Sequence, residues 1–102
     1  MYGTIMRARA KPGARETIEQ WLASLGATRV YPEGFLSSQL AWEDADPNRL
    51  VLTVHFRDKA SYIANAGSPE QDAEYRRMLE YLEGEPEWID VHYAGSQGRP
   101  LP

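Results

Sequence analysis

Two residues beside the middle of the chain have side chains that enzymes use for chemistry. His55 lies near the end of a strand-like run, and Asn65 lies near the end of the helix-like run that follows it. An imidazole can exchange a proton near neutral pH, and an amide can stabilise a developing anion. The other titratable candidates are Arg7, Arg9, Glu43, Arg57, Asp90 and His92. The absence of cysteine excludes thiolate nucleophiles, thiolate metal sites and disulfides.

The two histidines raise the question of a metal site. Alternation along the strands predicts that His55 and His92 lie on the same face of a sheet, with the first strand between theirs. Their side chains would then be about 9–10 Å apart, whereas a metal ion needs both nitrogens within about 2 Å. We therefore expect no metal site within one subunit. A site shared between two subunits, and a polar network at a subunit interface, remain as alternatives.

Asn65 itself has two interpretations. It can be a turn residue that ends a short helix before Gly67. It can also place an amide at the mouth of a pocket between helix and sheet. Trp21, Tyr62 and Tyr75 lie on helices and either line such a pocket or belong to the core. A mainly apolar pocket with a few polar groups would suit a small aromatic or polyketide-like ligand.

The elements that must position these residues follow from the hydrophobic pattern. Alternating runs predict strands at residues 2–10, 35–43, 49–57 and 87–94. Helical spacing and capping residues, with Asp58 and Ser68 as N-caps, predict helices at 14–25, 59–66 and about 69–83. The order β-α-β-β-α-β predicts a ferredoxin-like α+β fold, with a four-stranded antiparallel sheet and the helices on one face.

The same alternation assigns the two faces of the sheet. The most apolar face is predicted to meet the helices, and its residues are Leu50, Leu52, Val54, Phe56, Ile89, Val91 and Tyr93. The opposite face mixes polar groups with Ile5, Phe35, Val51 and Trp88. Exposed apolar patches of this kind usually mark an interface. We therefore expect a homodimer in which two sheets pack face to face.

Size and composition set further limits. The 102 residues fit one domain, expected at 1–94, followed by a flexible C-terminal tail at 95–102. The net charge of −4 argues against a nucleic-acid partner. No apolar run approaches the roughly 20 residues that span a bilayer, and the N-terminus lacks a signal-peptide pattern. We expect a soluble cytoplasmic protein with no membrane partner.

Three segments carry a resemblance to a known family. They are KPG at 11–13, GFLSSQLAWEDADPNRLVLTVHFRD at 34–58, and KASYIANAGSPE at 59–70. With these segments, the chain resembles the antibiotic biosynthesis monooxygenase family of the dimeric α/β-barrel superfamily, over about residues 3–94. Many members carry a histidine where this chain has Asn65, and haem-degrading members bind iron through a helix histidine. Because both histidines here lie on predicted strands, we expect no haem.

The resemblance implies a small monooxygenase that needs no cofactor and oxidises an aromatic or quinol-like molecule. It implies a ligand pocket between the sheet and the second helical region, with Asn65 as the catalytic hydrogen-bond donor. The expected substrate-binding residues are Trp21, Phe56, Tyr62 and Tyr75. No general base is assigned, since alternation places both histidines on the dimer side. The alternative is a non-catalytic dimeric module that binds a small molecule.

Overall fold

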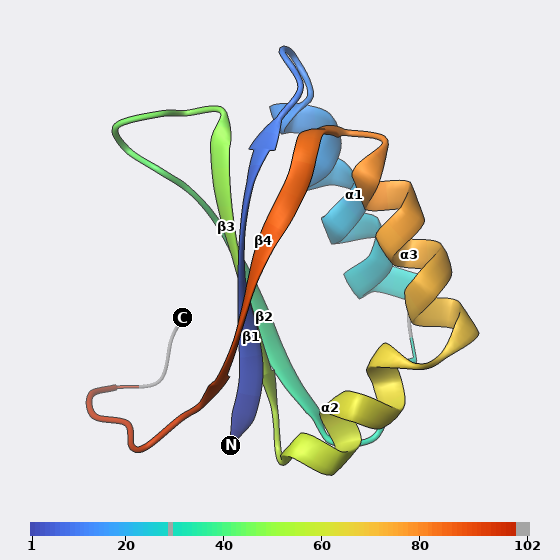
Figure 1. The fold of residues 1–102 in the computed structure, drawn as a ribbon, viewed down its shortest axis with the longest axis vertical. Coiled ribbons are helices and arrows are strands. Elements are labelled where there is room, and N and C mark those ends of the chain that lie inside the picture. The colour runs from blue at the N-terminus through green and yellow to red at the C-terminus, as the bar shows by residue number, and fades with distance from the viewer. Residues whose placement is uncertain (29, 100–102) are drawn as a thin grey trace.

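The computed structural model describes residues 1–28 and 30–99, with the side chain of Thr28 excepted. Four strands form one antiparallel sheet in the order β2-β3-β1-β4: β1 (Tyr2–Ala10), β2 (Phe35–Trp42), β3 (Arg49–Phe56) and β4 (Leu82–His92). The helices α1 (Arg15–Thr28), α2 (Lys59–Ala66) and α3 (Pro69–Leu79) lie on one side of this sheet (Figure 1). The ferredoxin-like α+β prediction is confirmed.

Local sequence signals explain where α2 and α3 begin. The Asp58 carboxylate accepts the Ser61 backbone N–H at 2.8 Å, as an N-cap does. Ser68 Oγ accepts the Gln71 backbone N–H at 3.2 Å, and Pro69 occupies the first helical position. Both predicted N-caps are confirmed, and they fix the corner where the chain turns from β3 into the helices.

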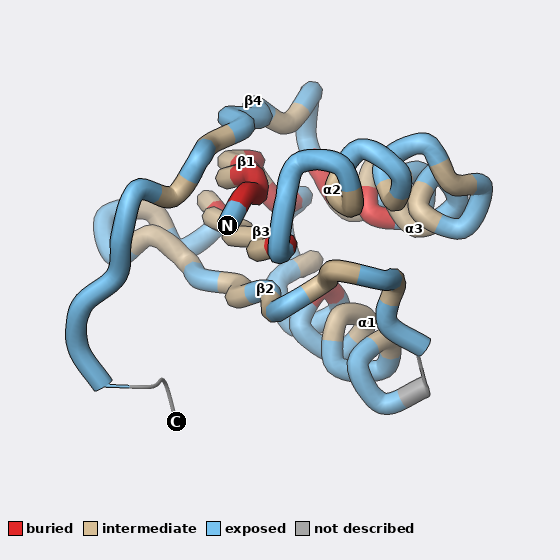
Figure 2. The backbone as a smooth tube through the Cα atoms, turned by 90° about the horizontal axis from the view of Figure 1, so that it is seen from below, coloured by how far each residue is buried: buried red, intermediate tan, exposed pale blue. Residues whose placement is uncertain are grey.

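The core lies between the middle of the sheet and the helices. β1 supplies the largest share, because its alternate residues Tyr2, Thr4, Met6, Ala8 and Ala10 are all buried. Figure 2 shows this buried strand enclosed between β3 and β4, with the helices on one side. The buried residues that pack against Met6, Ala8 and Ala10 are Ile18, Leu50, Met78 and Leu82.

Two predicted helix ends are wrong. α1 continues through Gly26 to Thr28, so this glycine does not end it. α3 stops at Leu79, and β4 starts at Leu82, well before the predicted residue 87. Leu82 is buried and pairs with Ala10, so burial of this side chain against β1 extends the strand. Gly84, at φ 69°, then lies within β4, where the pairing with β1 shifts register.

The predicted facing of β4 is also wrong. Trp88 pairs with Met6 and Asp90 with Thr4, so these β4 residues share the helix-facing side with buried β1 residues. Ile89 pairs with Ile5 and therefore lies on the open face, away from the helices. The more apolar face of β4, which carries Ile89 and Val91, is thus not the face that meets the helices. Of the helix-facing β4 residues, Trp88 lines a cavity on that side.

A bulge in β2 reverses the predicted facing of Phe35. The β2–β3 register shifts between Phe35 and Ser37, so that Phe35 pairs with Phe56 on the helix side. The extra residue, Leu36, is 54% exposed. One inserted residue moves every side chain beyond it to the other face, which alternation alone cannot anticipate. Leu40 and Trp42, beyond the bulge, pair with Leu52 and Leu50, respectively.

The two histidines consequently lie on opposite faces. His92 pairs with Tyr2 on the helix side, where the two rings meet edge to face at 4.8 Å. His55 lies on the open face, where its Nε2 is 3.1 Å from Gln39 Oε1 and its ring is 4.8 Å from that of Tyr93. The expectation that both share one face is wrong.

None of the helices within the described ranges combines the length and apolarity needed to cross a bilayer. The predicted tail at 95–102 includes 100–102, which lie outside the described residues. Residues 95–99 contain no helix or strand.

Candidate functional site

The sheet and the three helices line a partly open cavity of about 370 Å³ on the helix side. Its volume lies in the range of small-molecule sites, about 300–1,000 Å³. Most of the wall is apolar, and six ring side chains from six elements contribute to it. These are Trp21, Phe35, Phe56, Tyr62, Tyr75 and Trp88. Aromatic walls of this kind fit a flat, ring-containing ligand.

All five side chains predicted from the sequence as site residues line this one cavity. Trp21 comes from α1, Phe56 from β3, Tyr62 and Asn65 from α2, and Tyr75 from α3. Their proximity follows from the corner after β3, which sets α2 across one end of the sheet. Their roles in binding or catalysis stay a prediction.

Asn65 has both of the predicted features: its backbone takes part in the turn after α2, and its side chain lies at the cavity. Its backbone carbonyl accepts the Ser68 N–H at 3.0 Å and Ser68 Oγ–H at 2.8 Å, which ties α2 to the start of α3. Gly67, not Asn65, is the C-cap of α2. The side-chain amide lines the cavity and donates to Gln71 Oε1 at 3.4 Å. Gln71 therefore holds the amide in place beside the cavity.

A second polar group lies where α2 faces β1 and β4. The Tyr62 hydroxyl donates to Asp90 Oδ1 at 3.1 Å, and the Thr4 hydroxyl donates to the Ile89 carbonyl at 3.2 Å. Both Tyr62 and Thr4 line the cavity. Burial raises the pKa of Tyr62 to about 12, and the Asp90 carboxylate adds to this rise. Tyr62 therefore keeps its proton at neutral pH.

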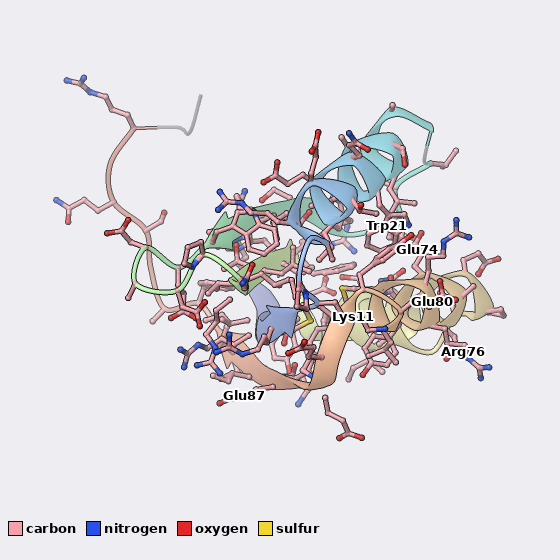
Figure 3. The ribbon with its side chains drawn as sticks, turned by 90° about the horizontal axis from the view of Figure 1, so that it is seen from above. Lys11, Trp21, Glu74, Arg76, Glu80 and Glu87 are labelled. Atoms are coloured by element: carbon pink, nitrogen blue, oxygen red, sulfur yellow. The ribbon has the colours of Figure 1, made fainter. Side chains whose placement is uncertain are left out.

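Carboxylates also reach the cavity from α3. Asp72 and Glu74 both line it, and Asp72 forms an exposed ion pair with Arg76 at 3.0 Å. Figure 3 shows Trp21 of α1 and Glu74 of α3 on facing sides of the space between these helices. A second, larger hollow of about 740 Å³ shares Asn65 and Glu74 with the first cavity. These two residues thus mark the boundary between the hollows.

The sequence patterns missed part of the cavity wall. Phe35 and Trp88 were assigned to the opposite face, and Thr4, Ser38, Gln71, Asp72 and Glu74 were not singled out as site residues. Gln71 had an available signal, since it lies four residues before Tyr75 and seven before Met78 on one helical stripe. No signal in the sequence could have placed Phe35 at the cavity, because the bulge at Leu36 decides which face of the sheet its side chain is on.

The open face carries a polar network, but not the one predicted. Arg7 and Arg49 lie 3.3 and 3.6 Å from Glu43, and Arg9 lies 2.7 Å from Asp46. Hydrogen bonding to Arg9 is the main cause of a lowered Asp46 pKa. Asp90 and His92, expected here, lie on the helix side instead.

At the other end of the open face, Gln39 joins two β3 side chains. Its Oε1 accepts Thr53 Oγ–H at 3.0 Å and lies 3.1 Å from His55 Nε2. Among the described residues, no group of three or more histidine, cysteine, aspartate or glutamate side chains could hold a metal ion.

Comparison with known proteins places this chain in a family. The model for the antibiotic biosynthesis monooxygenase family matches residues 1–77, which is most of the chain. The chain therefore belongs to the antibiotic biosynthesis monooxygenase family. A comparison with curated proteins found no significant match.

Solved structures share the fold over nearly the whole chain. A variant of SnoaB, a cofactor-independent oxygenase from Streptomyces nogalater, is 15% identical with a TM-score of 0.80, covering 96% of this chain and 97% of its own. A candidate antibiotic biosynthesis monooxygenase from Chloroflexus aurantiacus is 26% identical with a TM-score of 0.68, covering 95% and 96%. A conserved protein from Methanosarcina mazei is 18% identical with a TM-score of 0.76, covering 88% and 89%.

Proposed function

We propose that this protein is a small cofactor-independent monooxygenase that oxidises an aromatic or quinol-like molecule in the helix-side cavity. The observation that carries the proposal is the cavity itself, where six rings line the wall together with the hydrogen-bonded amides of Asn65 and Gln71. Membership in a monooxygenase-type family supports the reaction class. The cofactor-independent activity named for SnoaB supports the absence of a cofactor.

In the proposed reaction, the substrate supplies the electrons. A hydroquinone or anthrone loses a proton, and its electron-rich anion reduces molecular oxygen. For an anthrone, one oxygen atom becomes the new carbonyl oxygen, while the other leaves as water with the two hydrogens of the oxidised carbon. The protein needs to bind the ring, accept the proton and stabilise the anion.

Asn65 is the proposed donor to that anion. An asparagine amide has two N–H donors, and one is directed at Gln71 Oε1, so the second supports a contact with a substrate oxygen. Trp21, Phe56 and Tyr75 are proposed to hold the ring. The carboxylates of Asp72 and Glu74 at the cavity wall provide candidate proton acceptors, which the histidines do not, since neither lines the cavity.

Oxygen uptake with a panel of hydroquinones and anthrones tests the proposal. Asn65→Ala should lower kcat by about 100-fold, as loss of a single anion-stabilising donor does. Asn48→Ala is the matched control, because Asn48 is an exposed residue of the β2–β3 turn, and it should leave the rate unchanged. Absence of uptake across the panel, with ligand binding retained, would favour the alternative of a non-catalytic small-molecule-binding module.

We also propose that the functional unit is a homodimer formed through the open sheet face. Ile5, Val51, Ile89 and Val91 place apolar surface there, and Ile89 is 42% exposed. Contiguous exposed apolar surface of this kind is typical of an interface. A cytoplasmic location stays a prediction from the sequence.

A further inference from the structure

The polar end of the cavity at Tyr62 is built from hydroxyl groups whose protons already have acceptors. The Tyr62 hydroxyl donates to Asp90 Oδ1 at 3.1 Å, and the Thr4 hydroxyl donates to the Ile89 carbonyl at 3.2 Å. A hydroxyl has one proton and can also accept. The Thr4 side chain also interacts with the Tyr62 hydroxyl, which partly offsets the rise in the Tyr62 pKa that burial causes. With the Tyr62 proton directed at Asp90 and the Thr4 proton at Ile89, the capacity that the two oxygens still offer the cavity is acceptor capacity.

We propose that this acceptor end selects ligands that carry a free phenolic hydroxyl, and rejects those with a methoxy or carbonyl oxygen at the same position. A ligand hydroxyl can donate to Tyr62 Oη, whereas a methoxy or carbonyl oxygen would meet another acceptor without a proton between them. Tyr62 is half-buried, so a bound ligand would cover its oxygen, and an oxygen that is covered and left without a partner costs free energy. The discrimination therefore comes mainly from the rejected ligand.

Asp90 fixes the direction of this hydrogen-bond chain. An ionised carboxylate can only accept, so it holds the Tyr62 proton on the β4 side. Burial keeps the pKa of Tyr62 at about 12, so the chain keeps the same direction at neutral pH. Among the described residues, the other titratable group that acts on Tyr62 is Tyr2. Its ring centroid lies 5.2 Å from that of Tyr62, and it in turn contacts His92 and Lys59. Tyr62 is thus the residue that meets the ligand, and Asp90 positions its proton.

This inference rests on the proposed function only for the aromatic class of the ligand. The probes are therefore 2-hydroxyanthraquinone and 2-methoxyanthraquinone, which share one ring system and are not reduced quinols. Their binding is measured by quenching of tryptophan fluorescence, because Trp21 and Trp88 line the cavity. The pH is set where the absorbance of the free hydroxy compound shows that it is protonated.

The wild-type protein should bind the hydroxy compound about fivefold more tightly, which corresponds to a hydrogen bond of about 1 kcal/mol. Tyr62→Phe keeps the ring that packs against Tyr2 and Phe56, but it should bring the preference close to one. Asp90→Lys replaces an acceptor with a donor, turns the Tyr62 proton toward the cavity and should reverse the preference. Glu85→Lys makes the same charge change on β4 outside the cavity lining and should keep the fivefold preference.

Equal binding of both compounds by the wild-type protein, or an unchanged preference in Tyr62→Phe, would overturn the inference. Failure of the hydroxy compound to bind would do the same. The outcome is separable from the enzymatic proposal. A Tyr62-dependent preference without oxygen uptake from any quinol supports the selection of phenolic hydroxyls and contradicts the monooxygenase activity. Oxygen uptake without the preference supports the monooxygenase activity and contradicts the selection.

Discussion

At the scale of single residues, the corner after β3 contains one side chain that stabilises the fold, Asp58, and one that lines the candidate site, Asn65. Asp58 starts α2, and the Ser61 backbone N–H is the main cause that lowers the pKa of Asp58 to about 2. Asn65 lies in the last turn of the same helix, where its backbone carbonyl accepts from Ser68 and its side-chain amide lies beside the cavity. A structural carboxylate and a candidate functional amide thus lie seven positions apart in the chain.

The lowered pKa of Asp58 predicts a loss of stability in acid. Because the folded state holds this carboxylate ionised to lower pH, its contribution is present above about 3.8 and is lost as the pH falls toward 2. Asp58→Asn keeps an N-cap acceptor but should reduce this acid dependence. Asp58→Ala should lower Tm at neutral pH as well.

Thermal unfolding followed by circular dichroism between pH 2 and pH 7 measures both effects of the Asp58 variants. Asp44→Ala is the control, because it removes an exposed carboxylate from the β2–β3 turn. If Asp58→Ala and Asp44→Ala change Tm equally at neutral pH, the capping role of Asp58 is contradicted.

At the scale of the elements, the connection into β2 must pass close to α2. Gly34 has φ 82°, and its carbonyl accepts the Arg57 N–H at 2.7 Å. A Cβ at this position would overlap the Ser61 side chain. Ser61 also donates to the Asp58 carboxylate, so the loop before β2 and the cap of α2 are packed as one unit. This unit closes the end of the sheet where α2 borders the cavity.

Gly34→Ala should therefore destabilise the protein by about 2–3 kcal/mol, since a left-handed backbone and an overlap with Ser61 act together. Gly13→Ala provides the comparison. Gly13 has a similar φ of 78°, but a Cβ there meets nothing within 4 Å, so only the backbone cost of about 1 kcal/mol is expected. Urea unfolding of both variants measures the difference. Equal losses would show that the contact with Ser61 has no weight.

At the scale of the whole molecule, the sheet has one covered and one open face (Figure 1). The helices cover the face that carries the buried β1 residues, while Ile5, Val51 and Ile89 lie on the other. The chain after β4 also passes on the open side, and Tyr93 packs on His55 there. Because Ile89 and Val91 lie on the open face, β4 contributes more apolar surface there than the sequence predicted, which supports the proposal of a second subunit.

The proposed homodimer predicts different effects for two exposed isoleucines. Ile89→Glu places a charge on the open face and should convert the dimer to a monomer, because an interfacial carboxylate would be buried without a partner. Ile63→Glu changes an isoleucine that is 55% exposed on α2 and should leave the dimer intact. Gel filtration with light scattering distinguishes them. A monomeric wild-type protein would contradict the proposal.

The five predicted residues that line the cavity were named with the help of the family resemblance. The sequence pattern by itself determined the element order, the α2 segment and both N-caps. These depend on local signals, such as alternation, helical spacing and the Asp58 and Ser68 side chains, which act within a few residues. Only the tertiary structure decided the facing of Phe35, Trp88 and the histidines. One extra residue at Leu36 turns Phe35 over, and β4 takes its facing from pairing with β1, which lies far away in the chain.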